Sequence, residues 1–230
     1  MMTAILKQIS ILILPLLFAM TLHESAHAWV ADKKGDPTAR RLGRISLNPW
    51  VHIDLFGTII IPILLFLVSG GGAMFGWAKP VPVNTRNLHH PKQDMAWVAA
   101  AGPAMNLFLA LVSGLLYRLI LLPDDAFSSG EPSGWTRWFL LPVLLMLQFS
   151  IQFNLLLFFF NLIPIPPLDG GRVLAGLLPT RQAHQFLRIE PYGMWLLIFF
   201  FYIDPLGVMP GILGPMIDGL SGMIVGNPIH

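Results

Sequence analysis

Residues 9–27 read ISILILPLLFAMTLHESAH. The first half of this stretch is apolar apart from Ser10, and the second half ends on two histidines and a glutamate. A helix that crosses ~30 Å of hydrocarbon needs ~20 mostly apolar residues. Residues 4–31 are therefore predicted to form one membrane helix that carries ionisable side chains near its end.

The composition of the whole chain is that of a membrane protein. Of its 230 residues, 55% are apolar and only 11% are charged, whereas soluble domains carry about 25% charged residues. Apolar runs at about 94–122 and 135–163 predict two more membrane helices, and 192–203 is a weaker candidate. We expect an all-α polytopic membrane protein with about 4–6 transmembrane helices.

The domain organisation and several function classes follow from the same composition. We expect one integral-membrane domain over 1–230, with a core at about 4–180 and a C-terminal membrane segment and Gly/Pro-rich tail at 181–230. The absence of cysteine excludes disulfides and thiolate metal sites. No dense basic stripe with interleaved aromatic residues suggests nucleic-acid binding. The first span lacks a small-residue cleavage site, so we interpret it as retained.

Charges in the loops predict the topology, because short cytoplasmic loops are enriched in Lys and Arg. Residues 32–52 and 164–190 are rich in basic residues, whereas 123–134 contain three acidic residues and no basic one. The first and last long helices should then run towards the cytoplasm, and 94–122 the other way. Residues 53–86 must enter and leave on the same face, so we predict a re-entrant element with a partly extended, β-like segment near 70–86.

His23, Glu24 and His27 form an HExxH pattern. Histidines at positions i and i+4 lie one turn apart on one helix face and can reach a single metal ion. A glutamate beside them can take a proton from a water activated by that metal. The pattern lies roughly 10 Å inside the apolar run, where ionisable groups usually mark a functional site. The alternative is a buried polar patch that joins helices.

A catalytic zinc takes three protein ligands, so a third one must come from elsewhere in the chain. Glu131 falls in the predicted outer loop and Glu190 adjoins Pro191, which leaves neither well placed. Asp169 follows the last long helix, on the same side as His23 and at a similar depth. It can be the third ligand, or it can cap the helix that begins near Gly171.

Three motifs follow one another along the chain: HESAH at 23–27, AGPAMN at 101–106 and NLIPIPPLDGGR at 161–172. Together they resemble the site-2 protease family of intramembrane zinc metalloproteases. The segments GDPTARRLGRISLNPWVHIDLFGT (35–58) and FGWAKPVPVN (75–84) are similar to its compact bacterial branch without a PDZ domain. The resemblance covers roughly residues 15–180.

This resemblance implies an activity and a site. One Zn²⁺ per chain would be held by His23, His27 and Asp169, with Glu24 as the general base for a zinc-activated water. The reaction would be hydrolysis of peptide bonds in transmembrane segments, as in regulated intramembrane proteolysis. The implied partners are a transmembrane protein or a signal-peptide remnant and the lipid bilayer. The implied location is a bacterial cytoplasmic membrane, with the active site towards the cytoplasmic leaflet.

Further residues are candidates for contact with substrate. The resemblance also implies a role near the substrate for Asn106 and Asn161. Their amides stand in apolar helices, where they can stabilise an oxyanion, hold substrate or simply bond two helices together. Residues 77–83 alternate like an edge strand, and Pro80 and Pro82 lack N–H donors. An unwound substrate can pair with this segment, for which Gly76, Trp77 and Ala78 are candidates; a plain surface turn is the alternative.

Two rival functions share part of this pattern. A metal-ion transporter or sensor explains His and Asp in a membrane, but it gives Glu24 no task, and the interiors of the later helices lack carboxylates. A membrane protease of the CAAX-processing type shares HExxH, but it needs a glutamate as third ligand. No residue in the sequence identifies the substrate.

Overall fold

The computed structural model describes residues 2–68, 76–121, 136–203 and 207–226. Within these ranges the chain is helical and contains no strand. Three helices are long and apolar enough to cross a membrane, at Ile11–Lys33, Pro91–Leu121 and Trp138–Asn161. The predicted all-α membrane class is thus confirmed, although only three such helices, not four to six, occur in the described part of the chain.

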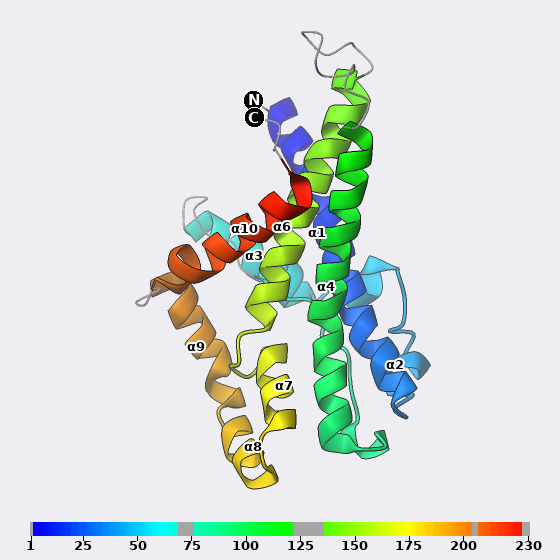
Figure 1. Cartoon of the computed structure of the whole chain (residues 1–230), viewed down its shortest axis with the longest axis vertical. Helices are drawn as coiled ribbons and strands as arrows, with labels where there is room; N and C mark the ends of the chain where they lie inside the picture. The colour runs from blue at the N-terminus through cyan, green and yellow to red at the C-terminus, as the bar shows by residue number, and fades with distance from the viewer. Residues whose placement is uncertain (1, 69–75, 122–135, 204–206, 227–230) are drawn as a thin grey trace.

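The three long helices form a central bundle. They are α1 (Met2–Lys33), α4 (Pro91–Leu121) and α6 (Leu141–Asn161), the last preceded by η4 (Thr136–Leu140). Figure 1 shows α1 and α6 running in one direction and α4 running in the other, packed against both. This is the relative direction that the loop charges predict, although residues 123–134 lie outside the described ranges.

Shorter helices surround the bundle. They are α2 (Thr38–Arg41), η1 (Pro49–His52), η2 (Leu55–Ile60), α3 (Ile61–Val68), η3 (Thr85–Asn87), α7 (Asp169–Leu177), α8 (Thr180–Leu187), α9 (Glu190–Ile203), η5 (Met209–Leu213) and α10 (Gly214–Val225). In Figure 1, α7 lies beyond the end of α6, and α9 runs back beside α7. The α10 helix then crosses back to the bundle. The sequence predicted only a Gly/Pro-rich tail where α10 forms.

The α10 helix is stabilised by packing against α4. A Cβ on Gly114 would lie 1.9 Å from Ile224 Cγ2, so the bare backbone of α4 admits this side chain. The buried core joins three helices at this place and contains Ala110, Tyr117, Leu144, Ile151, Leu155 and Val225. Tertiary packing thus outweighs the low helix propensity of the glycines in α10.

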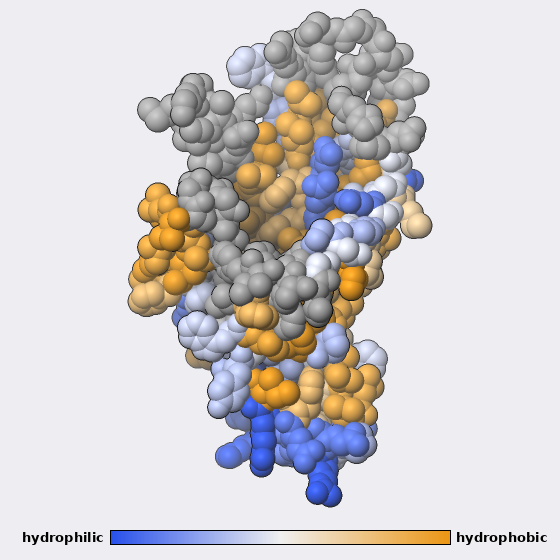
Figure 2. All heavy atoms as spheres, turned by 90° about the vertical axis from the view of Figure 1, so that its left-hand side faces the viewer, coloured by the Kyte–Doolittle hydropathy of each residue, from blue (hydrophilic) through white to orange (hydrophobic). Residues whose placement is uncertain are grey.

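The surface has the polarity of a membrane protein. Large apolar side chains such as Ile13, Phe18 and Phe108 are about half exposed along the bundle. Figure 2 shows large apolar areas, interrupted by a narrower hydrophilic stripe in the upper half, above a strongly hydrophilic end, where α8 lies. A soluble monomer rarely exposes so much contiguous apolar area, which agrees with lipid around the bundle.

The segment between α1 and α4 doubles back on itself. From η2 and α3 the chain leads away, and residues 76–84 return beside residues 52–57. Trp77 N donates to Gly57 O at 3.0 Å and Lys79 N donates to His52 O at 2.8 Å. Bonding at alternate residues is typical of an extended backbone, which agrees with the partly extended segment predicted near 70–86; its re-entry into the membrane stays a prediction. No strand is assigned among 76–86, and 69–75 lie outside the described residues.

Asp36 ties the two ends of this element together. Its fully buried carboxylate accepts hydrogen bonds from Thr38 N and Oγ1, from Asn84 N at 2.7 Å and from Asn87 Nδ2 at 2.8 Å. Burial raises the pKa of Asp36, but these hydrogen bonds outweigh it and hold the pKa below its usual value. The ionised carboxylate therefore stabilises the junction between α1 and α4.

Replacing Asp36 by Asn is expected to destabilise the fold. The change puts an NH₂ group among donors and should lower the free energy of unfolding by about 1–3 kcal/mol. The native pKa is lowered, so this stabilisation is present above the unfolded pKa of 3.8 and is lost as pH falls through the native pKa. Thermal unfolding in detergent should show a gap between the two proteins at pH 7 that closes below pH 4.

The control is Asp218→Asn, at an exposed aspartate of α10. Equal unfolding temperatures for Asp36→Asn and wild type at pH 7 would contradict the role given to Asp36.

Candidate metal centre

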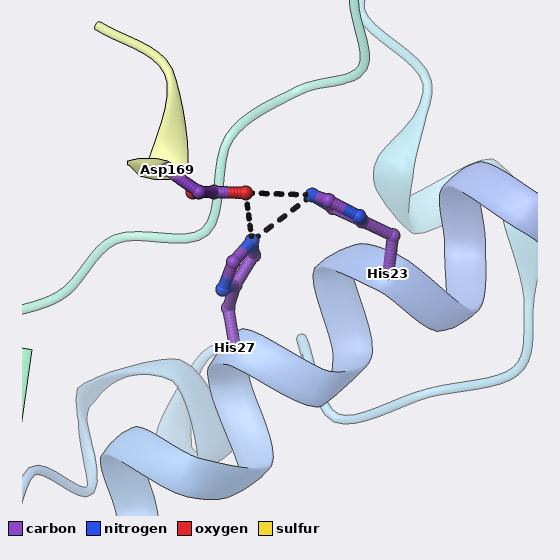
Figure 3. Close-up of side chains that lie close together, drawn as sticks. All are labelled: His23, His27 and Asp169. Atoms are coloured by element: carbon purple, nitrogen blue, oxygen red, sulfur yellow. Dashed lines mark hydrogen bonds and ion pairs between the residues drawn. The ribbon is translucent and has the colours of Figure 1, made fainter. Parts of the chain in front are cut away.

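Three ligand atoms from distant parts of the chain meet between α1 and α7. His23 Nε2 and His27 Nε2, one helical turn apart on α1, are 3.0 Å from each other. Asp169 Oδ2 lies 3.2 Å from the first and 3.3 Å from the second (Figure 3). Each of the three residues is only 8% exposed, and the distances of 3.0–3.3 Å leave no room for a water between the three atoms.

The other nitrogen of each imidazole is already engaged. His27 Nδ1 lies 2.6 Å from the carbonyl oxygen of Val98, and His23 Nδ1 lies 2.5 Å from Asn106 Oδ1. Oxygens at these places accept hydrogen bonds, so both Nδ1 atoms carry a proton, and in the neutral rings both Nε2 atoms can offer a lone pair to a metal ion. Asp169 Oδ2 is buried, and its contacts with the two Nε2 atoms are the ones that the structure gives it.

These donors suit a metal ion. Two imidazole lone pairs and a carboxylate oxygen facing one point repel one another unless a metal ion or a proton lies between them. Two histidines and one carboxylate are a donor set used by catalytic zinc, which keeps a further position for water. Among the described residues this is the group of His, Asp and Glu side chains that could hold such an ion.

Asp169 is the first residue of α7, and the residue that caps the helix is Leu168. No cap hydrogen bond comes from a side chain there, so the capping alternative is not what the structure contains. A Cβ on Gly170 would lie 2.3 Å from the carbonyl oxygen of Leu162. The glycines after Asp169 are therefore required by close backbone contact with the preceding loop, which aims the carboxylate at α1.

One face of α4 supports both histidines. Val98, Gly102 and Asn106 recur every four residues and so lie in line on the helix. A Cβ on Gly102 would lie 2.4 Å from His27 Nε2 and 2.6 Å from His23 Cε1. The bare backbone at Gly102 lets α4 approach the imidazoles, and Val98 and Asn106, one turn to each side, then reach the two Nδ1 atoms.

A cavity of ≈ 390 Å³ opens beside the three ligand atoms. It is lined by His23, Glu24, His27 and Asp169, and also by four of the predicted substrate-contact residues, Asn161, Gly76, Trp77 and Ala78. Asn161 Nδ2 donates to Leu157 O within its own helix. Asn106 is fully buried behind His23 and does not line the cavity.

Glu24 is held by residues 76–84, the returning part of the segment between α1 and α4. Its Oε2 accepts a hydrogen bond of 3.0 Å from Val81 N. Arg44 fixes the same part of the segment by donating to the carbonyl oxygens of Lys79 and Pro80. The extended segment thus forms one wall of the cavity, with Glu24 next to the histidines on the other.

Sequence reasoning missed several supports of this site. Val98 acts through its backbone carbonyl, and Val81 through its backbone N–H, so their side chains give no signal. Gly102 did give a signal in the sequence. It lies four residues before Asn106 in a membrane helix, where a glycine often marks close packing against another element.

Comparison with known proteins identifies the family. The model of peptidase family M50 matches residues 11–130 and 137–203. The chain belongs to this family. M50 members are zinc metalloproteases of the site-2 protease type, so the protein is a membrane metallopeptidase, and the resemblance found in its motifs is confirmed.

Curated relatives agree with the M50 assignment. The chain is 39% identical over 213 residues to a Bacillus subtilis protein described as "Putative zinc metalloprotease YwhC", covering 90% of this chain and 85% of the relative. It is 28% identical over 186 residues to the Rip2 protein of Mycolicibacterium smegmatis, which bears the same description, covering 79% and 62%. Rip2 of Mycobacterium tuberculosis matches similarly. No solved structure matches the chain significantly.

Replacing Gly102 by Ala is expected to weaken metal binding. The added methyl group collides with both imidazoles and must displace them, so zinc affinity should fall by roughly 10–100-fold, as when other supports of metal ligands are lost. A chelator competition assay on detergent-solubilised protein measures this.

Ala104→Val, at an exposed position of the same helix, is the matched control and should bind like wild type. Wild-type affinity in Gly102→Ala would refute the close approach of α4 to the histidines.

Proposed function

We propose that this M50 protein is an intramembrane protease that hydrolyses peptide bonds in the transmembrane segments of its substrates. Residues 1–230 form its one membrane domain in this proposal. The observation that carries the proposal is the convergence of His23, His27 and Asp169 within 3.3 Å beside a cavity that also contains Glu24. His23, His27 and Asp169 would hold the zinc, which would supply Lewis-acid activation of water and of the scissile carbonyl.

Glu24 is the general base in this proposal. It lines the cavity without belonging to the ligand group, so its carboxylate is free to take a proton from the attacking water and give it to the leaving amine. The Val81 N–H holds one carboxylate oxygen and so orients the group. Asn161, also on the cavity wall, has a second amide N–H available for substrate.

The extended segment is the proposed binding edge for an unwound substrate. Residues 77, 79 and 81 direct their N–H groups to the protein, so the alternate residues 78, 80 and 82 face the other way. Of these, Pro80 and Pro82 have no N–H, and Arg44 occupies the Pro80 carbonyl. Within the described residues no hydrogen bond involves the Ala78 backbone, which leaves it to pair with substrate and set its register.

The proposed setting is a bacterial cytoplasmic membrane, with the cavity towards the cytoplasmic leaflet. Basic residues gather at the end of the bundle where α1 finishes and α4 begins, and short cytoplasmic loops carry such residues. Water would reach the site from this side. The substrate is then a membrane-spanning protein or a signal-peptide remnant that unwinds near this leaflet.

Replacing Glu24 by Gln should abolish turnover and keep the metal. The amide oxygen can still accept from Val81 N–H, but the side chain no longer takes up a proton, so cleavage should fall by at least ~100-fold. The measurement is cleavage of a model transmembrane peptide in detergent micelles, beside zinc content. Glu190→Gln, at the partly exposed partner of Arg172, should cleave normally. A Glu24→Gln protein that retains cleavage would eliminate Glu24 as the base.

Replacing Ala78 by Pro should impair cleavage and spare zinc affinity. The change removes the N–H at the proposed pairing position without touching a metal ligand. Ala78→Gly, which keeps the N–H, is the matched control and should cleave much faster than Ala78→Pro. Equal cleavage by both variants would rule out substrate pairing at this position.

A further inference from the structure

A buried chain of amide groups leads from His23 through α4 into α6. Asn106 Oδ1 faces His23 Nδ1, and Asn106 Nδ2 donates to Asn154 Oδ1 at 2.8 Å. Asn154 Nδ2 in turn donates to the carbonyl oxygen of Ser150 at 2.8 Å. Asn106 is 0% exposed and Asn154 is 1% exposed, so neither water nor lipid can replace a partner in this chain.

The far end of the chain sets the orientation of each amide. A backbone carbonyl only accepts, so the group of Asn154 that faces Ser150 O must be its NH₂. The amide oxygen of Asn154 then faces Asn106 and accepts from its NH₂ group. The Asn106 oxygen is left for His23, whose Nδ1 must carry the proton, and His23 Nε2 keeps its lone pair towards Asp169.

We propose that Asn154 is a positioning residue: acting through Asn106, it holds His23 in the tautomer that can bind zinc. The inference rests on the proposed function in taking zinc as the bound ion. Asn154 lies outside the cavity lining and outside the ligand group, so its effect on the metal passes through Asn106 and His23.

The two histidines explain why one of them requires such a chain. His27 donates to the backbone carbonyl of Val98, which cannot turn round to present a donor. His23 donates to a side-chain amide, which can rotate and offer NH₂ in place of oxygen. A rotated Asn106 would force the proton of His23 onto Nε2 and remove a zinc ligand. Asn154 prevents that rotation.

A role as interhelical glue makes a different prediction. Simple attachment of α4 to α6 requires an Asn106–Asn154 bond in either direction, and its loss would lower stability without a specific effect on the metal. The proposed role depends on direction: what matters is that an acceptor faces His23 Nδ1. An aspartate at position 106 offers only acceptors and should satisfy His23.

The experiment measures zinc dissociation constants by chelator competition, and unfolding temperatures of the zinc-free proteins, without any cleavage assay. Asn154→Leu and Asn106→Leu should each weaken zinc binding by roughly 10–100-fold, the range for lost supports of metal ligands. Asn106→Asp should bind zinc as tightly as wild type. Gln152→Leu, at an exposed amide of α6, the helix that contains Asn154, is the matched control and should also bind zinc as wild type does.

Each outcome decides the proposal. Wild-type affinity in Asn154→Leu, or an equal loss in Gln152→Leu, would overturn it, and so would an Asn106→Asp protein that binds as weakly as Asn106→Leu. A variant that unfolds at a lower temperature but binds zinc normally would show interhelical glue instead. Failure of the wild type itself to bind zinc would overturn the proposed function, a result distinct from all of these.

Discussion

Three electron-pair donors point at one another inside an apolar bundle, and a metal ion bound between them would remove their repulsion. Two imidazole nitrogens and a carboxylate oxygen lie within 3.3 Å of each other, each on a residue only 8% exposed. Uncompensated, such a cluster would be costly at this depth. The fold supports it with protons on the far side of each ring, so that both lone pairs stay directed at one point.

The α4 helix connects the two histidines to the rest of the fold. Its positions 98, 102 and 106 lie in one line and serve both histidines, while the next turns pack against α6 and α10. The motif AGPAMN then has a physical meaning: glycine removes the barrier to close approach, and asparagine supplies the acceptor one turn later. A glycine has the same effect after α6, where the missing side chain of Gly170 lets α7 begin at Asp169 in close contact with the preceding loop.

Much of this arrangement could be predicted from the sequence, because periodicity and hydropathy act locally. The i and i+4 spacing of His23 and His27 predicts that both lie on one face of the helix, and the loop charges predict the relative direction of the three long helices; the depth of the histidines in the membrane stays a prediction. The α10 helix was missed because its stability comes from a distant glycine of α4. Backbone groups such as Val98 O and Val81 N–H leave no mark in the sequence. The direction of the Asn106 and Asn154 amides depends on contacts 48 residues apart.

The most direct measurement of the central claim is the zinc X-ray absorption spectrum of the purified, metal-loaded protein. We expect one zinc per chain with two imidazole ligands and further oxygen ligands at about 2.0–2.2 Å, and loss of the bound metal in Asp169→Ala. A spectrum with fewer than two histidines, or Asp169→Ala protein that retains full zinc with an unchanged spectrum, would contradict it.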